Sequence, residues 1–369
     1  MKTSALPYWA NAAIDSNGGV FEFLEMDGTP INDINRRVRV QARFAYTYAH
    51  AAELGWYENG KQASDHAWHY LLGPGSAGAE GFGGPEYTGC AHLLNSDGSL
   101  HDGLRDTYAQ AFVILAGAWR YMAFNDNEAL DIAKQTFLFL ENNVKAKNGG
   151  WYEGIPASLP RRQNPHMHMF EALMSLYDAT SDQTILDRAG EIFYLFKTVF
   201  FDPDQGVLLE FFDNDWVPIE GGGPIEPGHM MEWVWLLREY EARSGVDVDS
   251  YADVLYTTAK RMGYAAQTGL LYDGVGIDGS VGSASFRIWP QLEMIKAAIA
   301  QTKAGHLDAQ EDISQTIDVL FDTYFNVDIK GGWADQFDEQ ANMISTNMPT
   351  STAYHMLCAV AEVDRFLKS

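Results

Sequence analysis

Apolar residues recur along the chain at the three- and four-residue spacing of amphipathic helices, and the stretches with this spacing come in pairs. The first stretches of the pairs begin near Asn35, Leu104, Pro165, Gly228, Ala284 and Pro349. Their partners begin near Gly60, Asn127, Asp182, Asp249 and His306, with one more around Tyr8 to Ile14. Asn164 before Pro165 predicts an N-cap followed by proline in the first helical position, and Pro349 predicts the same start for the last helix.

A short phrase of glycine followed by aromatic or aliphatic residues separates these pairs. It reads GGVFEFL from Gly18, GGWYEGI from Gly149, GVLLEFF from Gly206, GLLYDGV from Gly269 and GGWADQF from Gly331. From Gly149 onward the copies lie about 60 residues apart, and the first gap is about twice as long, which predicts a degenerate copy between Gly73 and Gly103. Six such units would account for the whole chain of 369 residues.

Six helical hairpins joined by short β-like turns predict an all-α fold, the (α/α)6 barrel or toroid, in which six outer helices surround six inner ones. A closed ring buries both ends of the repeat, so no polar capping repeat is needed. Chains above about 300 residues usually divide into domains. Because neither a linker nor a low-complexity segment interrupts these repeats, we expect a single catalytic domain over residues 1–369.

Acidic residues dominate the charge of the chain. There are 25 Lys and Arg against 50 Asp and Glu, which gives a formal net charge of −25 at pH 7. Such a charge repels nucleic-acid phosphates and anionic membrane surfaces, so we expect neither as a partner. The visible basic cluster comprises Arg36, Arg37, Arg39 and Arg43. A neutral small molecule therefore suits this chain better than a polyanion.

The cysteines and the N-terminus bear on the compartment. Cys90 and Cys358 stand far apart in apolar sequence, which predicts neither a disulfide framework nor a cysteine metal site. The N-terminal residues lack an apolar core of signal-peptide length, and no run of about 18 apolar residues is present to cross a membrane. These features predict a soluble, cytoplasmic protein and leave open whether it forms a homo-oligomer.

Polar and aromatic residues gather near the starts of the first helices of the pairs. They are Arg43, Tyr108, His168, Glu171, His229, Glu232, Trp289, Glu293 and His355. If these helices all start at one end of the ring, their side chains meet in one bowl. A bowl of aromatic residues with a few polar groups is typical of sites for sugar-sized ligands.

Two of these helices carry the spacing H-x-x-E. His168 and Glu171 would share one helix face, and so would His229 and Glu232. A carboxylate so placed can accept a proton from one imidazole nitrogen and direct the other at a substrate, as a general acid or base near neutral pH requires. Recurrence of the spacing in two repeats favours function over coincidence.

His355 and Arg43 each allow two interpretations. His355 could be a partly buried histidine satisfied by a backbone carbonyl, but its position in the repeat, taken as equivalent to those of His229 and His168, favours a role in the pocket. Arg43 could be an exposed helix charge. Its apolar neighbours instead indicate an interior arginine whose fixed donors face hydroxyl or carbonyl oxygens.

Sequence signals for metals and cofactors are weak. His66 and His69 share a helix face without a third ligand nearby, and we interpret them as surface or packing residues. His166 and His168 do not share a helix face, so a metal-binding pair is improbable. The sequence holds no Walker loop, no Rossmann glycine motif after a strand and no G-x-S-x-G turn. We therefore expect neither a metal nor a cofactor.

Five phrases occur in the order found in a known family: RVQARFAYTYAHAAELGW, NPHMHMFEAL, EPGHMMEWVWLL, RIWPQLEMIKA and STAYHMLCA. In these phrases the chain resembles the N-acylglucosamine 2-epimerase superfamily, and within it the mannose isomerase-like branch. The resemblance covers essentially the whole chain and agrees with the barrel predicted from the repeats. It implies metal-free proton transfer at the carbons beside a sugar aldehyde.

The resemblance also implies roles for individual residues. His355 corresponds to the main catalytic base, and His229 to a second acid or base that is oriented by Glu232. Arg43 and His168 match positions that contact the reacting oxygens of the substrate. The remaining residues expected to bind substrate are Tyr108, Glu171, Trp289 and Glu293.

The implied reaction is aldose–ketose isomerisation of a free monosaccharide, with D-mannose and D-fructose as the expected pair and a cis-enediolate as intermediate. The same histidines would also permit a 2-epimerase of the mannose/glucose, N-acylglucosamine or cellobiose type. A sulfoquinovose isomerase is a further alternative. Arginines that could contact its sulfonate are Arg161, Arg162, Arg238 and Arg287.

Two alternatives of another class stay open. A glycoside hydrolase or lyase on the same fold would use paired carboxylates, for which Asp102, Glu153 and Glu232 are candidates. A catalytically silent sugar-binding protein would lack a histidine or arginine of the bowl, and none is missing.

Overall fold

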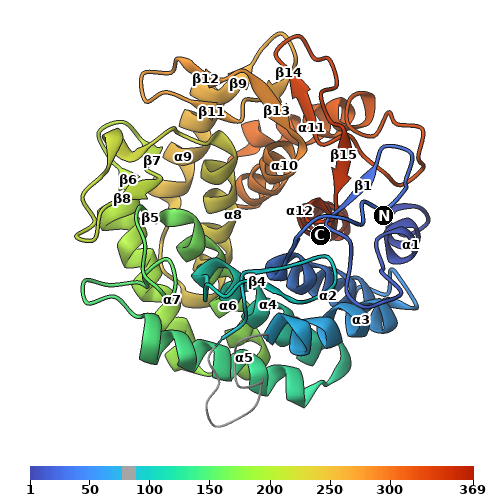
Figure 1. Ribbon diagram of the computed structural model, residues 1–369. Helices are drawn as coiled ribbons and strands as arrows, with labels where there is room; N and C mark the ends of the chain where they lie inside the picture. Colours follow the sequence, from blue (N-terminus) through green and yellow to red (C-terminus); the bar gives the residue numbers. More distant parts are fainter. Residues whose placement is uncertain (77–88) are drawn as a thin grey trace. The chain divides into compact units, whose positions relative to one another are not determined.

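The computed structural model describes residues 1–76 and 89–369 (Figure 1). Its contacts divide the chain into two compact units. Unit 1 comprises Met1–Leu195 with Pro349–Tyr354, and unit 2 comprises Phe196–Met348 with His355–Ser369. Part of the expected degenerate repeat, residues 77–88, lies outside the described residues. The single domain expected from the repeats stays a prediction.

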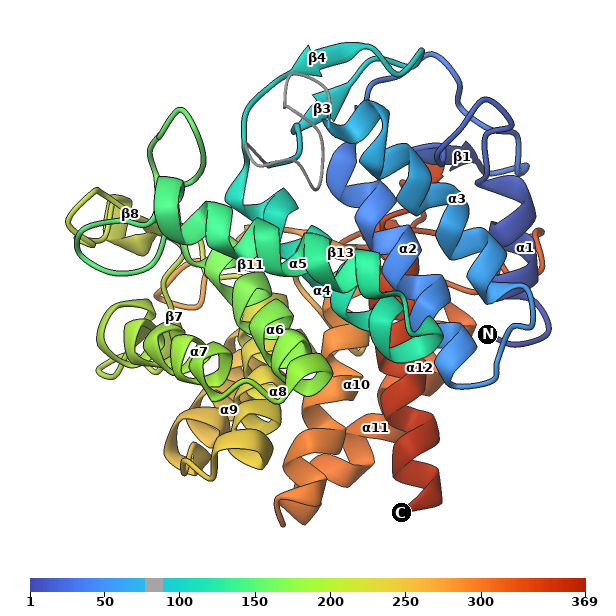
Figure 2. The same ribbon diagram turned by 90° about the horizontal axis from the view of Figure 1, so that it is seen from below.

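The helices of unit 1 follow the predicted pairs. They are α1 (Ala5–Ala12), α2 (Val38–Glu53), α3 (Gly60–Leu72), α4 (Thr107–Phe124), α5 (Asn127–Phe139), α6 (Gln163–Thr180) and α7 (Gln183–Leu195). Helix α4 packs against both α2 and α6, while α3, α5 and α7 each pack on the helix that precedes them (Figure 2). Alternate helices therefore form a row, and each carries its partner on one side.

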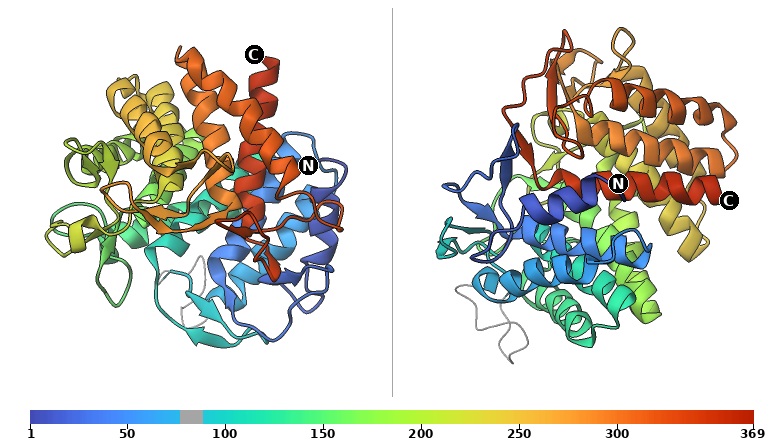
Figure 3. Two further views of the ribbon diagram at one scale, coloured as in Figure 1. Left: turned by 90° about the horizontal axis from the view of Figure 1, so that it is seen from above. Right: turned by 90° about the vertical axis from the view of Figure 1, so that its right-hand side faces the viewer.

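Unit 2 repeats this arrangement. Its helices are α8 (Pro227–Ser244), α9 (Asp249–Gly263), α10 (Ile288–Lys303) and α11 (Gln310–Asp322), together with α12 (Thr352–Lys368) from His355 onward. Helix α10 packs against α8, and α9 and α11 pack on α8 and α10 respectively (Figure 3). Short 3₁₀ or π turns add Pro74–Ser76, Leu140–Val144, Phe196–Phe200, Glu220–Gly222 and Leu307–Ala309.

Burial distinguishes the first helices of the pairs from their partners. Nearly every residue of α10 is buried, including the polar Gln291, Glu293 and Lys296. In α11 only Ile313 and Thr316, with Leu320 one turn further, are buried. A helix buried on all sides belongs to the interior, whereas a single apolar stripe marks a surface helix. The sequence prediction of inner and outer helices is thus confirmed within each unit.

Both proline-based helix starts are wrong. Helix α6 begins at Gln163 with Arg162 as its N-cap residue, so Pro165 is the third helical residue and Asn164 makes no cap. Pro349 ends a strand, and α12 begins only at Thr352. The first N–H groups of a helix lack intrahelical partners anyway, so proline is tolerated throughout the first turn and does not mark its first residue.

Strands are two or three residues long and connect the helices. They are β1 (Phe23–Glu25), β2 (Arg36–Arg37), β3 (Leu93–Leu94), β4 (Leu100–Asp102), β5 (Arg161–Arg162), β6 (Phe201–Asp202), β7 (Val207–Leu208), β8 (Phe211–Phe212), β9 (Tyr264–Ala265), β10 (Leu270–Leu271), β11 (Gly274–Val275), β12 (Val281–Ser283), β13 (Ser285–Arg287), β14 (Gln336–Asp338) and β15 (Asn347–Pro349). Antiparallel pairs include β2–β3, β3–β4, β6–β7, β9–β10, β11–β12 and β13–β14. These ladders are the short β-like turns that the sequence predicted.

The recurring glycine phrase forms the tight turn after an outer helix. Gly206 lies in the turn between β6 and β7 with φ of 68°, and Gly269 lies between β9 and β10 with φ of 74°. Gly149 has φ of 96° within the Lys145–Trp151 bridge. Only glycine adopts such values without strain, so the phrase keeps glycine wherever the chain must reverse.

An inner-helix glutamine holds the turn to the helix that follows it. Its side-chain amide accepts from one backbone N–H of the turn and donates to the carbonyl of the same residue. The pairs are Gln41 with Val20, Gln110 with Cys90, and Gln291 with Leu271. In the Gly149 repeat His166 replaces the glutamine, and its Nε2 accepts from the N–H of Trp151 at 3.0 Å. His166 is therefore a structural residue.

Candidate active-site residues

Two histidines of unit 2 lie beside one indole ring. His229 is in the first turn of α8, Trp289 is the second residue of α10, and His355 is on α12. The ring centroids of His229 and Trp289 are 5.1 Å apart, and those of Trp289 and His355 are 5.7 Å apart. Both imidazoles are buried. His229 and His355, which were both expected in the bowl, therefore lie beside the same indole although they are far apart in the sequence.

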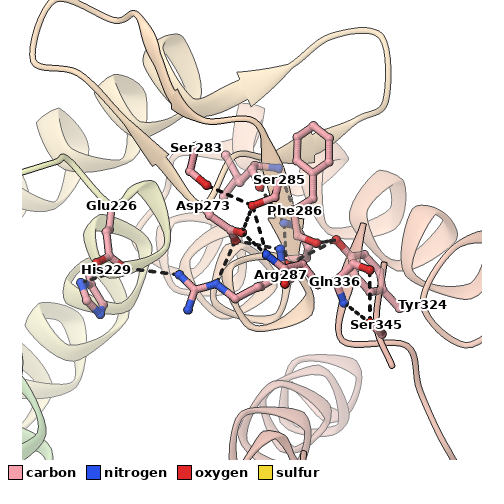
Figure 4. A network of polar contacts seen from close by, with 12 residues as sticks. Glu226, His229, Asp273, Ser283, Ser285, Phe286, Arg287, Tyr324, Gln336 and Ser345 are labelled. Carbon is pink, nitrogen blue, oxygen red and sulfur yellow. Dashed lines mark hydrogen bonds and ion pairs between the residues drawn. The ribbon is translucent and has the colours of Figure 1, made fainter. Parts of the chain in front are cut away.

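His229 is surrounded by carboxylates. Its Nδ1 lies 2.9 Å from Oε1 of Glu210. It also lies 3.7 Å from Oε2 of Glu226, which precedes α8 and is labelled beside His229 in Figure 4. Burial by itself would lower the pKa of His229, but the negative charges of Glu210 and Glu226, with a smaller contribution from Glu232, raise this pKa to about 10. The imidazole is thus protonated at neutral pH and can donate a proton.

The carboxylate that meets Nδ1 of His229 is Glu210, whereas the H-x-x-E spacing pointed to Glu232. Glu210 is the fifth residue of the glycine phrase GVLLEFF of its repeat. The corresponding carboxylate in three other repeats binds the arginine at the N-cap of the next inner helix, through its backbone N–H and its side chain. These pairs are Glu22 with Arg37, Glu153 with Arg162, and Asp273 with Arg287. Before α8 the N-cap residue is Glu226. Glu210 has no arginine at that position and binds His229 instead.

A polar network fixes the chain that leads into Trp289. Asp273 accepts from the backbone N–H of Arg287 at 2.8 Å and from Oγ of Ser285 at 2.5 Å (Figure 4). The guanidinium of Arg287 lies 3.1 Å from Asp273 and 3.8 Å from Glu226. This arginine therefore connects the start of α10 to the carboxylates around His229.

His355 has a different environment. Its Nδ1 lies 2.7 Å from Oε1 of Glu293, and Oε2 of the same carboxylate lies 2.7 Å from Nζ of Lys296. Burial alone would raise the pKa of Glu293, but Lys296 and His355 outweigh it and lower this pKa. The carboxylate is ionised and is shared between an ammonium and an imidazole. Glu293, which was expected to bind substrate, thus orients His355. The hydrogen-bond partner of this imidazole is therefore a carboxylate and not the backbone carbonyl that the sequence analysis considered.

Unit 1 brings together the other predicted residues. Nη2 of Arg43 donates to the hydroxyl of Tyr108 at 2.6 Å, and its guanidinium lies 4.3 Å from the ring centroid of Phe112. His168 lies 4.8 Å from the rings of both Tyr108 and Phe112. Arg43 is only 8% exposed, which excludes its interpretation as a surface charge.

Glu171 completes this cluster. It accepts from the hydroxyl of Tyr354 at 2.5 Å, and its Oε2 lies 3.7 Å from Nδ1 of His168. The i,i+3 spacing therefore places the two side chains on one face as predicted, with a hydroxyl as an additional partner. Arg43 also stacks on the ring of Tyr354 at 4.9 Å.

The N-cap residues give the inner helices a common register. Arg43, His168 and Glu293 each stand six residues after the N-cap of their helix, and Glu232 does so in α8. His229 stands only three residues after its N-cap, one helical turn earlier. The assumed equivalence of His229 and His168 is therefore wrong, and Glu232 is the residue of α8 that matches His168.

Comparison with known proteins identifies the family. The N-acylglucosamine 2-epimerase family model matches residues 19–359. The chain belongs to the N-acylglucosamine 2-epimerase family. A mannose-6-phosphate isomerase from Rhizobium meliloti (strain 1021) is 32% identical, with the match covering 100% of this chain and 96% of that protein. A D-mannose isomerase from Thermobifida fusca is 26% identical over 89% of this chain and 83% of its own.

A solved structure confirms the fold. The crystal structure of a D-mannose isomerase superimposes with a TM-score of 0.87 at 26% identity, covering 98% of this chain and 95% of that chain. The fold class is thus the (α/α)6 barrel expected from the repeats. The protein is a sugar isomerase or epimerase of its family. Among the residues that the structure describes, no helix is both long and apolar enough to span a bilayer.

Two groups in unit 2 of this family member bring possible metal ligands together. They are Glu210, Glu226 and His229, and Glu232, Glu293 and His355, with ligand atoms within 4.8 Å in each group. In the first group the raised pKa of His229 opposes metal binding, because a metal ligand must be deprotonated. In the second the ammonium of Lys296 lies 2.7 Å from Glu293 and repels a cation. The charges favour proton transfer, and the metal-free reaction stays a prediction.

The sequence analysis missed Glu210, Lys296 and Tyr354. Glu210 could have been found by aligning the carboxylates within the glycine phrases that precede α2, α6, α8 and α10. Of these four repeats, only the one before α8 lacks an arginine at the N-cap. Lys296 follows Glu293 at helical spacing, but its burial depends on neighbouring helices. Tyr354 could not be distinguished from a core residue.

The surface and packing interpretation of His66 and His69 is consistent with their positions. Nε2 of His66 lies 3.0 Å and 2.9 Å from the carbonyl oxygens of Asp15 and Gly19, which holds a turn in place, and His69 is exposed. The arginines considered for a sulfonate all bind groups of the protein. Their partners are Asn148 for Arg161, Glu153 for Arg162, Asp249 for Arg238 and Asp273 for Arg287.

Proposed function

We propose that this protein is an aldose–ketose isomerase that interconverts free D-mannose and D-fructose by proton transfer through a cis-enediolate. One observation carries the proposal: two buried histidine–carboxylate pairs, centred on His229 and His355, flank Trp289. In the first pair, the carboxylates of Glu210 and Glu226 give an excess of negative charge around the imidazole of His229. The second pair shares its carboxylate with an ammonium.

These charges suit an acid and a base. His355 would accept the C2 proton of the open-chain aldose at Nε2, because its Nδ1 bonds to Glu293. The electrons of the C2–H bond form the C1–C2 double bond, and O1 takes the negative charge. Protonated His229 would donate to O1 from Nε2, because its Nδ1 bonds to Glu210. Preorganised donors of this kind stabilise charge that develops in the transition state.

The second half of the reaction returns both protons. The imidazolium of His355 would deliver its proton to C1, while the hydroxyl proton of O2 leaves to His229 and the C2 carbonyl of the ketose forms. No net proton is gained or lost, and no redox partner is required. The contacts of Arg43 and His168 with the reacting oxygens, and the substrate-binding roles of Tyr108 and Glu171, remain predictions.

Mannose 6-phosphate is a second candidate substrate, since the Rhizobium meliloti relative is named for it. The surroundings of His229 favour a neutral sugar there. In the network of Figure 4, Glu226 and Asp273 lie near the guanidinium of Arg287. With Glu210, which lies 2.9 Å from His229, three carboxylates stand against two positive charges, those of Arg287 and protonated His229. Such a balance repels a phosphate dianion from this side.

A hydrolase of the same fold is disfavoured by its expected carboxylates. Asp102 is exposed on β4, and Glu153 binds Arg162 through its backbone and its side chain. A pair of carboxyl groups free to act as acid and nucleophile or base is what glycoside hydrolysis requires.

The test is product analysis with a substrate panel in heavy water. Mannose, fructose, glucose, N-acetylglucosamine, cellobiose, sulfoquinovose and mannose 6-phosphate would each be incubated with the protein, and the sugars separated by chromatography. We expect mannose to give fructose with deuterium at C1. A C2 epimer with little ketose would identify the protein as an epimerase instead. Turnover of mannose 6-phosphate alone would show that the phosphorylated sugar, and not free mannose, is the substrate.

A further inference from the structure

Lys296 is a fully buried lysine on α10. Its Nζ lies 2.7 Å from Oε2 of Glu293, and neither side chain is exposed to solvent. The ammonium also lies 3.6 Å from the ring centroid of Trp235 on α8, at cation–π distance. Lysine is almost never fully buried unless it is paired, because its charge loses hydration. The pairing with Glu293 therefore offsets a substantial cost.

Glu293 connects this lysine to His355. Its oxygen Oε1 accepts from Nδ1 of His355 at 2.7 Å, while Oε2 meets Lys296. The carboxylate is thus held from both ends. An ion pair that served only to fill the interior would not need to share its carboxylate with a histidine that lies beside Trp289.

We propose that Lys296 is a positioning residue: by sharing Glu293 with His355, its ammonium holds the imidazole in the neutral, proton-accepting form. This inference rests on the proposed function for its catalytic consequence. Because Lys296 already compensates the negative charge of Glu293, a second positive charge on His355 would gain little electrostatic stabilisation. Without the ammonium, the buried carboxylate and imidazole would keep a proton between them to higher pH.

Two further carboxylates of unit 2, those of Glu232 and Glu362, bear on this group of charges. Glu232 on α8 has a carboxylate oxygen within 4.8 Å of the ligand atoms of Glu293 and His355. Glu362 on α12 is buried, and its pKa is raised by burial against the opposing charges of Arg365, Lys303 and Lys296. Of the two, the carboxylate of Glu232 favours a proton on His355, while Glu362 interacts with the positive charges of Arg365, Lys303 and Lys296. The buried ammonium of Lys296 opposes the effect of Glu232 through its 2.7 Å contact with Glu293.

The first experiment is the pH profile of kcat/KM for Lys296→Met, which keeps the length of the side chain and removes its charge. We expect the acidic limb of the profile to move up by one to two pH units, which lowers kcat/KM at pH 7 about ten- to hundredfold and lets it recover toward alkaline pH. A lower plateau with an unmoved acidic limb would mean that Lys296 is merely structural, and would overturn the proposal.

Two variants serve as controls. Lys303→Met makes the same substitution on the same helix at a partly exposed lysine whose ion pair with Glu362 spans 3.8 Å, so the profile should not move. Lys296→Arg keeps the positive charge and should restore the acidic limb toward its original pH. If Lys296→Met does not fold, Lys296→Gln gives the same comparison, because it retains a donor for Glu293 without the charge.

The second experiment does not depend on activity. The imidazole of His355 would be titrated by NMR in protein labelled with ¹⁵N-histidine, and assigned with His355→Gln. We expect the Glu293–His355 pair to release its proton at least one pH unit higher in Lys296→Met than in the original chain. An unchanged titration would refute the proposal even if the sugar reaction is confirmed. A shifted titration without sugar turnover would refute only the proposed function.

Discussion

The surroundings of His229 and of His355 contrast within one unit of the molecule. Both imidazoles lie beside Trp289, and the Nδ1 of each bonds to a buried glutamate. Around His229 a second carboxylate, Glu226, adds negative charge at 3.7 Å. Around His355 the glutamate is shared with Lys296. The same residue pair can therefore supply an acid or a base, depending on what compensates the carboxylate.

The repeats show how the first environment arose. Inner helices α2, α6 and α10 start after an arginine that neutralises the carboxylate of the preceding turn, whereas α8 starts after Glu226. Because the N-cap residue of α8 is a glutamate and not an arginine, Glu210 pairs with the imidazole of His229 instead. A carboxylate position that binds the N-cap arginine in three repeats binds a histidine in the fourth.

The largest expected loss of activity comes from removing either of the two imidazoles that differ in this way. We expect His355→Ala and His229→Ala each to lower kcat by about 10²- to 10⁴-fold, because each would remove a general acid or base. The measurement is the initial rate of ketose formation, with circular dichroism to show that the variants fold. Near-normal rates in both folded variants would contradict the assignment.

Glu210→Gln should weaken the acid without removing it. The pKa of His229, raised to about 10, would fall because its nearest negative charge is lost. Activity that needs the protonated imidazole is present below this pKa and lost above it, so the basic limb of the pH profile should move to lower pH. We expect kcat at pH 8 to fall about tenfold or more. Glu153→Gln, which alters the matching carboxylate of another repeat, should leave the basic limb in place.

Glu226→Arg tests the comparison between repeats directly. The new arginine would match Arg287 in its repeat and compete with His229 for Glu210, so the basic limb should again move to lower pH. Glu226→Gln removes one charge without adding another and should give a smaller shift in the same direction. An identical shift in the two variants would show that arginine does not capture Glu210.

Metal removal should have the smallest effect. Dialysis against a chelator is expected to leave kcat within about twofold, since the charges of His229 and Lys296 oppose a cation in both candidate groups. Loss of activity that is restored by one divalent metal would show that the carboxylate groups bind metal. It would contradict the metal-free proton transfer proposed around Glu293.

Much of the fold followed from local patterns. Helix pairs were predicted within a few residues because apolar spacing and glycine turns are properties of short segments. The starts at Pro165 and Pro349 were wrong, since proline is compatible with several positions near a helix end. The side chains of the site were predicted as a set, but not their pairing. Glu210 takes the place expected of Glu232 beside His229, and Glu293 bonds to His355.

The sequence by itself determined the helical repeat, the family and the histidines, because these depend on residue types at fixed spacings. The tertiary structure decided which carboxylate meets which imidazole. Glu210 lies 19 residues from His229 and Glu293 lies 62 residues from His355 along the chain. Charge compensation acts through space, so the charges around each histidine come from neighbours such as Glu226 and Lys296 that only the packing of separate helices and turns brings within reach.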